Sequence, residues 1–137
     1  MKAQTDQEEV ADAPFGMHQV LSELVRGALR EIPDLVSIAL GDHQGLPIIS
    51  ATRGKVPAMT FTAMATMSLQ AAKTAADAVG LEGPDYMVVH SENGELVVVR
   101  VRDDFACLIG LLSPGANLGF ALVTLRRLAE QINQALE

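Results

Sequence analysis

Residues 111–132 place an apolar run, a Gly/Pro turn and a helical pattern in the order that many proteins use to bind a phosphate. The segment reads LLSPGANLGFALVTLRRLAEQI. A Walker loop needs Lys and Ser or Thr after its second glycine, but Phe and Ala stand there. A dinucleotide fingerprint needs a βαβ unit, and no strand follows this helix in the sequence. The segment instead favours a structural role. Pro114 and Gly115 turn the chain, Asn117 caps the helix, and Gly119 permits close approach to a sheet.

The remaining reactive side chains do not form a catalytic constellation. Asp42 and His43 are adjacent on a predicted turn, so their side chains diverge and His43 is exposed. His18 lies on the outer side of a predicted helix, and His90 lies in a predicted strand. Cys107 stands inside an apolar run and is predicted to be a buried small apolar residue. With one cysteine and three scattered histidines, we expect no metal site, no cofactor and no enzymatic activity.

Composition predicts one soluble domain with an aliphatic core. The chain has 137 residues, of which 49% are apolar, with no Trp and only five Phe and Tyr residues. A net charge of −7 argues against nucleic acid or an anionic membrane as partner. The acidic N-terminus is not a signal peptide, so we expect a cytoplasmic location. Residues 1–14 are predicted to be a flexible acidic tail, and residues 15–137 a single domain.

The first part of the domain is predicted to be a helix followed by a hairpin. Apolar residues at three-and-four spacing indicate a helix from about residue 17 that ends near Glu31, before Pro33. Residues 35–40 and 46–52 alternate as two strands around a turn at 41–45. Because Pro47 lacks a backbone donor, the second strand is expected at a sheet edge.

The predicted central helix, residues 57–79, is apolar nearly all round. It carries no charge between Lys55 and Lys73, and Gly80 suits its C-terminal cap. A helix of this kind needs burial on more than one side. A sheet covers only one side, so the second cover is most simply another copy of the chain. One stripe contains Phe61, Met64, Ala65, Leu69, Ala72, Ala76 and Val79, and the other contains Met59, Ala63, Met67, Ala71 and Ala75.

The last third is predicted to contain three strands and a helix. Strands at 86–91, 95–102 and 105–112 are joined by turns at Asn93-Gly94 and Asp103-Asp104. Apolar residues occupy both faces of the second and third of these strands, which must therefore be covered on both sides. A helix over 117–136 completes the order α-β-β-α-β-β-β-α. Antiparallel hairpins and three helices predict a three-layer α/β/α domain.

This element order and three local motifs resemble the Roadblock family, which contains the dynein light chain Roadblock and prokaryotic small-GTPase regulators of the MglB kind. The motifs are IALGDHQGLPIIS, the Ala- and Met-rich central helix, and LIGLLSPGANLGFALVTLRRLAEQI. The resemblance covers about residues 17–137. It implies a profilin-like fold with a five-stranded antiparallel sheet in the order 2-1-5-4-3. The central helix would lie on one face and the terminal helices on the other.

The resemblance also implies a non-catalytic, homodimeric regulator that binds a Ras-like small GTPase and modulates its nucleotide state. Members pair the third strand and the central helix with a second copy, and the paired helices commonly receive the GTPase. The residues expected at the dimer interface are Met59, Ala63, Met67, Ala71, Ala75, Tyr86, Val88 and His90. Those expected on the GTPase platform are Thr62, Met64, Thr66, Gln70 and Lys73.

Several alternatives stay open at this point. The chain could be a scaffold or a cytoskeletal or motor light-chain subunit without GTPase contact, or a small-ligand sensor, for which no lined pocket is evident. The methionines of the central helix fill a core or form an adaptable surface. Arg53 is a solvated loop charge or an arginine finger. His90 would make the interface sensitive to pH if it lies there.

Overall fold

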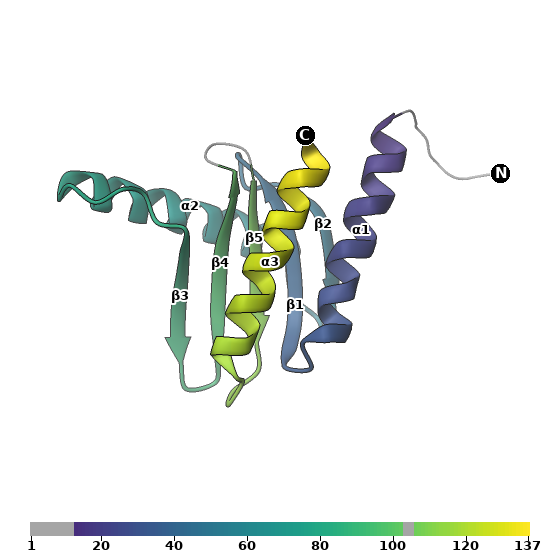
Figure 1. Ribbon diagram of the computed structural model, residues 1–137. Helices are drawn as coiled ribbons and strands as arrows, with labels where there is room; N and C mark the ends of the chain where they lie inside the picture. The colour runs from purple at the N-terminus through teal and green to yellow at the C-terminus, as the bar shows by residue number, and fades with distance from the viewer. Residues whose placement is uncertain (1–12, 103–105) are drawn as a thin grey trace.

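The computed structural model describes residues 13–102 and 106–137 and has the predicted element order (Figure 1). A five-stranded antiparallel sheet has the strand order β2-β1-β5-β4-β3, as predicted. Helices α1 and α3 cover one face, and α2 lies on the other (Figure 1). The elements are α1 (Ala13–Glu31), β1 (Leu35–Asp42), β2 (Pro47–Thr52), α2 (Ala58–Ala78), β3 (Tyr86–Ser91), β4 (Gly94–Arg102), β5 (Ala106–Leu112) and α3 (Leu118–Leu136).

Successive side chains of the central strands point to opposite faces of the sheet, and apolar residues on both faces produce two cores. Val97 and Val99 of β4 face α1 and α3, whereas Val98 faces α2. The larger core contains Val25 of α1 and Leu125 of α3, both of which are buried. This arrangement places a core on both faces of β4 and β5, as their doubly apolar pattern predicted, although α2 covers only part of its face.

The β1–β2 hairpin follows the predicted turn chemistry. The Asp42 carboxylate accepts hydrogen bonds from the backbone N–H groups of Gln44 (2.9 Å) and Leu46 (3.0 Å). His43 is exposed on this turn, as expected. Pro47 begins the edge strand β2 opposite Gly41, where the register shifts, so its missing donor costs no ladder bond.

Helix α1 ends at Glu31, as Pro33 predicted, and Arg53, in the loop after β2, contacts that end. The Arg53 guanidinium donates hydrogen bonds to the carbonyl oxygens of Leu29, of Pro33 (2.5 Å) and of Leu35 (2.9 Å). A cation at a helix C-terminus satisfies carbonyls that have no partner within the helix. Arg53 is thus an exposed loop charge, as one interpretation of the sequence held, but its guanidinium also contacts the end of α1.

The turn before α3 is structural, as predicted, but one of its glycines has a different role. Asn117 caps α3 by accepting a hydrogen bond from Phe120 N (3.0 Å). Gly119 is exposed, and a Cβ there would meet only Asn117 Oδ1, at an ordinary 3.6 Å. The glycine that lets α3 approach the sheet is Gly110 of β5. A Cβ there would lie 3.1 Å from Leu125 Cδ1. The role predicted for Gly119 is therefore wrong.

The N-terminal boundary differs slightly from the sequence prediction. Helix α1 begins at Ala13, so the last two residues of the predicted tail belong to the helix. Pro14 is tolerated in a first turn, where its missing N–H would have no helical partner. Residues 1–12, the predicted Asp103-Asp104 turn and residue 105 lie outside the described residues. No helix in the described part of the chain is long and apolar enough to cross a membrane.

Candidate functional site

Helix α2 crosses its face of the sheet near the end that carries the β1–β2 turn, and its C-terminal half extends beyond the edge strand β3 (Figure 1). Its buried residues are Thr62, Ala65, Thr66 and Leu69. From Gln70 to Ala78 every residue is exposed or half-buried. About half of this nearly uncharged helix therefore has no covering layer within the described residues of the chain.

Where α2 crosses β1, the side of the helix that faces the sheet is formed by small residues. Thr62 and Thr66 are 0% and 3% exposed and lie over Gly41 of β1. A Cβ at Gly41 would stand only 2.4 Å from Thr62 Cγ2, so the helix packs directly on the glycine backbone. Thr62 and Thr66 were expected on the GTPase platform. That expectation is wrong, because burial keeps both side chains from any partner.

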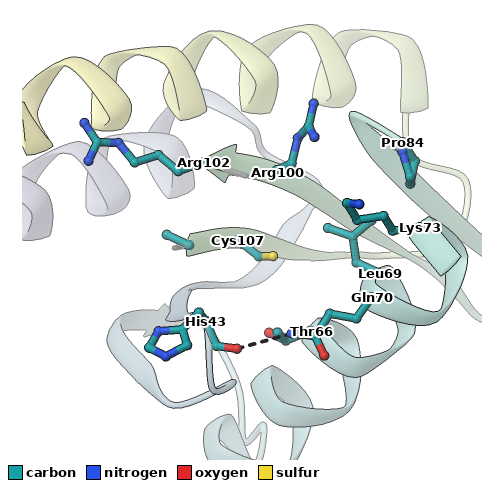
Figure 2. Close-up of a pocket in the computed structure, with 10 residues that line it drawn as sticks. His43, Thr66, Leu69, Gln70, Lys73, Pro84, Arg100, Arg102 and Cys107 are labelled. Carbon is teal, nitrogen blue, oxygen red and sulfur yellow. Dashed lines mark hydrogen bonds between the residues drawn. The ribbon is translucent and has the colours of Figure 1, made fainter. Parts of the chain in front are cut away.

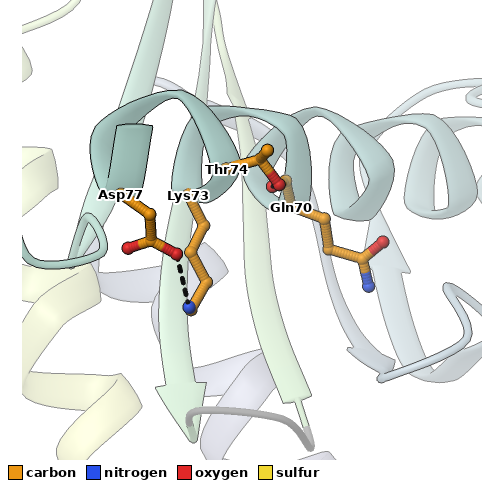
Figure 3. Close-up of polar contacts among 4 residues, drawn as sticks. All are labelled: Gln70, Lys73, Thr74 and Asp77. Carbon is orange, nitrogen blue, oxygen red and sulfur yellow. Dashed lines mark hydrogen bonds and ion pairs between the residues drawn. The ribbon is translucent and has the colours of Figure 1, made fainter. Parts of the chain in front are cut away.

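The other three platform residues, Met64, Gln70 and Lys73, are exposed on α2, and Figure 3 shows the last two. Met64 is 55% exposed and points away from the buried row. Gln70 Nε2 donates a hydrogen bond to the carbonyl oxygen of His43 (3.3 Å), which ties this side of α2 to the β1–β2 turn. Lys73 Nζ forms an ion pair with Asp77 Oδ2 (3.2 Å) one turn further along. A role for these residues in partner binding stays a prediction.

The residues predicted at the dimer interface lie on α2 and on β3. On the helix, Met59, Met67, Ala71 and Ala75 are exposed or half-buried, as is Ala63. On the edge strand, Tyr86 and His90 are exposed, and Val88 is half-buried against the core under α1 and α3. The structure thus leaves nearly all of these residues accessible in the single chain, and their contact with a second copy stays a prediction.

Polar contacts hold β3 in place on the side that faces β4 and α3. Asp85, just before β3, accepts a hydrogen bond from Arg100 of β4 (2.6 Å), and the Arg126 guanidinium lies 5.2 Å from the centre of the Tyr86 ring. His90 Nδ1 lies 2.9 Å from Glu95 Oε2 across the β3–β4 pair. The opposite side of β3 is the sheet edge, where it pairs with no other strand among the described residues. A free strand edge is a template for pairing with another chain.

Sequence reasoning missed a second accessible surface, the part of the sheet that α2 does not cross. Val89 of β3 is 48% exposed. Leu96 of β4 and Leu111 of β5 are paired neighbours and are half-buried. Phe61 of α2, like Met87 and Leu96, is partly buried and packs against the core between α2 and the sheet. Apolar residues on both faces of β3 and β4 were the signal, but the sequence did not show how little of that face one helix covers.

A small hollow of about 60 Å³ lies between α2 and strands β4 and β5 (Figure 2). Leu69, Pro84 and Cys107 line it, with Gln70 and Lys73 from the helix. Burial raises the pKa of the Cys107 thiol, and the nearby Arg100 opposes this only in part. A thiol kept protonated in this way is a poor nucleophile. Among the described residues, no three His, Cys, Asp or Glu side chains gather to hold a metal ion.

Solved structures of MglB and of a Roadblock/LC7 domain share this fold. An MglB structure with a tetrameric arrangement matches with a TM-score of 0.81 at 20% identity, covering 92% of this chain and 92% of that chain. The gliding protein MglB of Thermus thermophilus gives 0.78 at 19% identity, covering 92% and 93%. The Roadblock/LC7 domain from Streptomyces avermitilis gives 0.75 at 19% identity, covering 84% and 96%.

These similarities define the class of the fold. At such identities they establish the architecture, which is the profilin-like α/β fold of the Roadblock and MglB structures, as the sequence motifs predicted. No protein-family model matches the sequence. No curated protein matches it either. Binding partners must therefore be argued from the surfaces of α2 and β3.

Proposed function

We propose that this chain forms a homodimer through β3 and α2, and that the dimer binds a Ras-like small GTPase and modulates its nucleotide state. The observation that carries the proposal is the C-terminal half of α2. From Gln70 to Ala78 it extends past a free strand edge and contains no buried residue, and its two charges, Lys73 and Asp77, pair with each other. An apolar helix without a second cover is unfavourable in water, which supports its use as an interface. The resemblance to Roadblock proteins supplies the class of partner.

The geometry supports a particular arrangement of the two copies. Antiparallel pairing of two β3 edges about a two-fold axis would extend the sheet across both copies. The same rotation would carry the second copy's α2 to the opposite end of this sheet. Its overhanging half would then cover Val89 and Leu96, and its side would approach Ala75. A single interface would thus pair the free strand edge and bury both the overhanging half of α2 and the open part of the sheet.

The proposed effect on the GTPase is a shift between its nucleotide states. A protein that binds one state more tightly than the other favours that state by the difference in binding free energy. Faster hydrolysis would require further help, such as an arginine finger or a repositioned catalytic glutamine. The Arg53 guanidinium is engaged by three backbone carbonyls within this chain, which disfavours its use as a finger. We therefore propose that any acceleration comes from repositioning of the GTPase's own residues.

The proposal is tested by measuring the affinity of the full chain for the small GTPases encoded near its gene, each loaded with GDP or with a non-hydrolysable GTP analogue. We expect tighter binding of one nucleotide state for at least one GTPase. Failure to bind in either state, for all of them, would contradict the proposed function. Co-purification of a different protein in that case would identify the chain as a scaffold or light-chain subunit.

A further inference from the structure

The end of α2 projects two apolar side chains into solvent. Val79, which follows the last residue of the helix, is 72% exposed, the largest fraction for any large apolar side chain in the part of the chain that the structure describes. Leu81 is 63% exposed. Both lie at the end of α2 that extends beyond β3, and we call them the α2 tip (Figure 1). The dimer-interface residues predicted on this helix from the sequence end at Ala75 and do not include the tip.

Backbone hydrogen bonds hold the α2 tip in one conformation. Gly80 has a positive φ of 83°, and its N–H donates to the carbonyl oxygen of Asp77 (3.2 Å). The N–H of Leu81 donates to the carbonyl oxygen of Ala76 (2.9 Å). These two bonds form a Schellman motif, in which the residue after the glycine commonly contacts an earlier residue of the helix. That earlier residue is Ala76, whose short side chain leaves most of Leu81 exposed. The tip is therefore a structured apolar projection, which loses little conformational entropy when it is buried.

The reach of α2 indicates what the tip meets in the proposed homodimer. Leu69 of the helix and Val98 of β4 belong to the same core between α2 and the sheet. From Leu69 to Val79 the helix advances by about 15 Å, at 1.5 Å per residue. In a sheet that β3 pairing continues into a second copy, three strand spacings separate the two β4 strands, a distance of about 14 Å. Because α2 runs across the strands (Figure 1), its tip would reach the second copy's β4.

The register of the strands indicates which part of that β4 strand lies under the tip. Val98, which lies in the core under α2, is paired with Met87 of β3. A two-fold axis at Val88, near the middle of β3, would place Met87 opposite the second copy's Val89. Val89 is paired with Leu96 of β4, and it is 48% exposed on the open part of the sheet. The tip of one copy and the open part of the other copy's sheet would therefore meet.

From this geometry we propose that the α2 tip of each copy packs on Val89 and Leu96 of the other copy and anchors both ends of the dimer interface. The inference rests on the homodimer of the proposed function and adds contacts that the pairing of β3 does not by itself require. Each tip removes from water apolar side chains that are accessible in the single chain, and their burial favours association.

Disulfide formation between two different variants tests the contact directly. In a Cys107→Ala background, one variant carries Leu81→Cys and the other carries Leu96→Cys. A disulfide requires two Cα atoms within about 7 Å of each other. After mixing and mild oxidation we expect a disulfide that joins one copy of each variant. Each variant alone should stay unlinked, because the two tips lie at opposite ends of the dimer. As a control, Val123→Cys on α3 should form no disulfide with Leu96→Cys.

The dimer dissociation constant, measured by dilution of fluorescently labelled chains, shows how much the tip contributes. Val79→Ser/Leu81→Ser should raise it at least ~10-fold, because two apolar side chains no longer become buried. Val79→Ile/Leu81→Met, which keeps both positions apolar, should stay within about threefold of the wild type, as should the control Val123→Ser. A wild-type dimer that forms no mixed disulfide, or a Ser double variant within about threefold of the wild type, would overturn the inference and leave the homodimer intact. A wild-type chain that is monomeric at every concentration would overturn both.

Discussion

Replacing Gly41 by alanine should displace α2 from the sheet and destabilise the fold. The added Cβ would lie 2.4 Å from Thr62 Cγ2, whereas two carbon atoms rest at roughly 3.5–4.0 Å. The two elements must therefore separate by more than about 1 Å. Thr62 is fully buried and its side chain is stiff at χ1, so it yields poorly. Alanine is otherwise favoured over glycine in a strand, so any loss of stability measures the clash.

The expected loss in free energy of unfolding follows from the overlap of the added methyl group with the Thr62 side chain. Overpacking a core costs about 1–3 kcal/mol, and a contact this short belongs in the upper half, at about 2–3 kcal/mol. Thr62→Ser removes Cγ2 and costs about 1 kcal/mol on its own. In the double variant the alanine methyl occupies the vacated space, so the total loss should fall to about 1 kcal/mol. The coupling energy between the two positions then has a magnitude of about 2–3 kcal/mol.

The assay is urea unfolding of the four proteins at one protein concentration, because dimerisation makes apparent stability depend on concentration. Thermal unfolding should show Gly41→Ala lower in Tm by roughly 8–12 °C, at about 4 °C per kcal/mol for a domain of this size. The double variant should recover most of that loss. Additive effects, with the double variant less stable than either single variant, would refute the packing of α2 directly on Gly41.

Three further predictions concern other surfaces and the core. Ala75→Glu should halve the mass measured by light scattering, because a carboxylate buried in the proposed α2 interface would have no partner. The control Val123→Glu on α3 should keep the dimer mass. An Ala75→Glu variant that stays dimeric would count against an interface at Ala75. Thr124→Val should raise the free energy of unfolding by about 1 kcal/mol in urea titrations, since the buried Thr124 hydroxyl has no hydrogen-bond partner among the described residues. A variant that is less stable than the wild type would show that the hydroxyl does have a partner. Iodoacetamide should modify Cys107 slowly at neutral pH until the protein unfolds, because burial raises the pKa of its thiol; rapid labelling of the native protein would contradict its burial.

The sequence was sufficient for the order of elements because each is signalled locally. Alternating apolar residues indicated the strands, Pro33 ended α1, and Asn117 was recognisable as the cap of α3. The doubly apolar strands β4 and β5 required layers on both faces of the sheet, which the two cores confirm. These features depend on neighbours a few residues apart, where periodicity and turn chemistry are informative.

The side of α2 that faces the sheet could not be predicted, because a helix that is apolar nearly all round has no unique inward direction. Hydropathy favours burial of Met64 and Met67, yet the structure buries Thr62 and Thr66 in their place. The reason is steric. The helix lies so close to Gly41 that only small side chains fit between helix and sheet at that point, and this closeness is a property of the assembled layers.

Other residues escaped prediction because their contacts span long stretches of sequence. Arg53 caps a helix that ends more than twenty residues earlier, and no local pattern marks that pairing. Gly110 was overlooked inside a strand, while Gly119 attracted attention because it opens a helix. The open area around Leu96 became visible only when the position of α2 across the sheet was known.

The central claim is that α2 and β3 together form a surface that a second copy covers. It is tested most directly by the light-scattering mass of the full chain over a range of concentrations. Two chains of 14.6 kDa give 29.2 kDa, and we predict that value across the range. A mass of 14.6 kDa throughout would contradict the claim, because the edge strand and the overhanging half of α2 would then be stable in water without a partner.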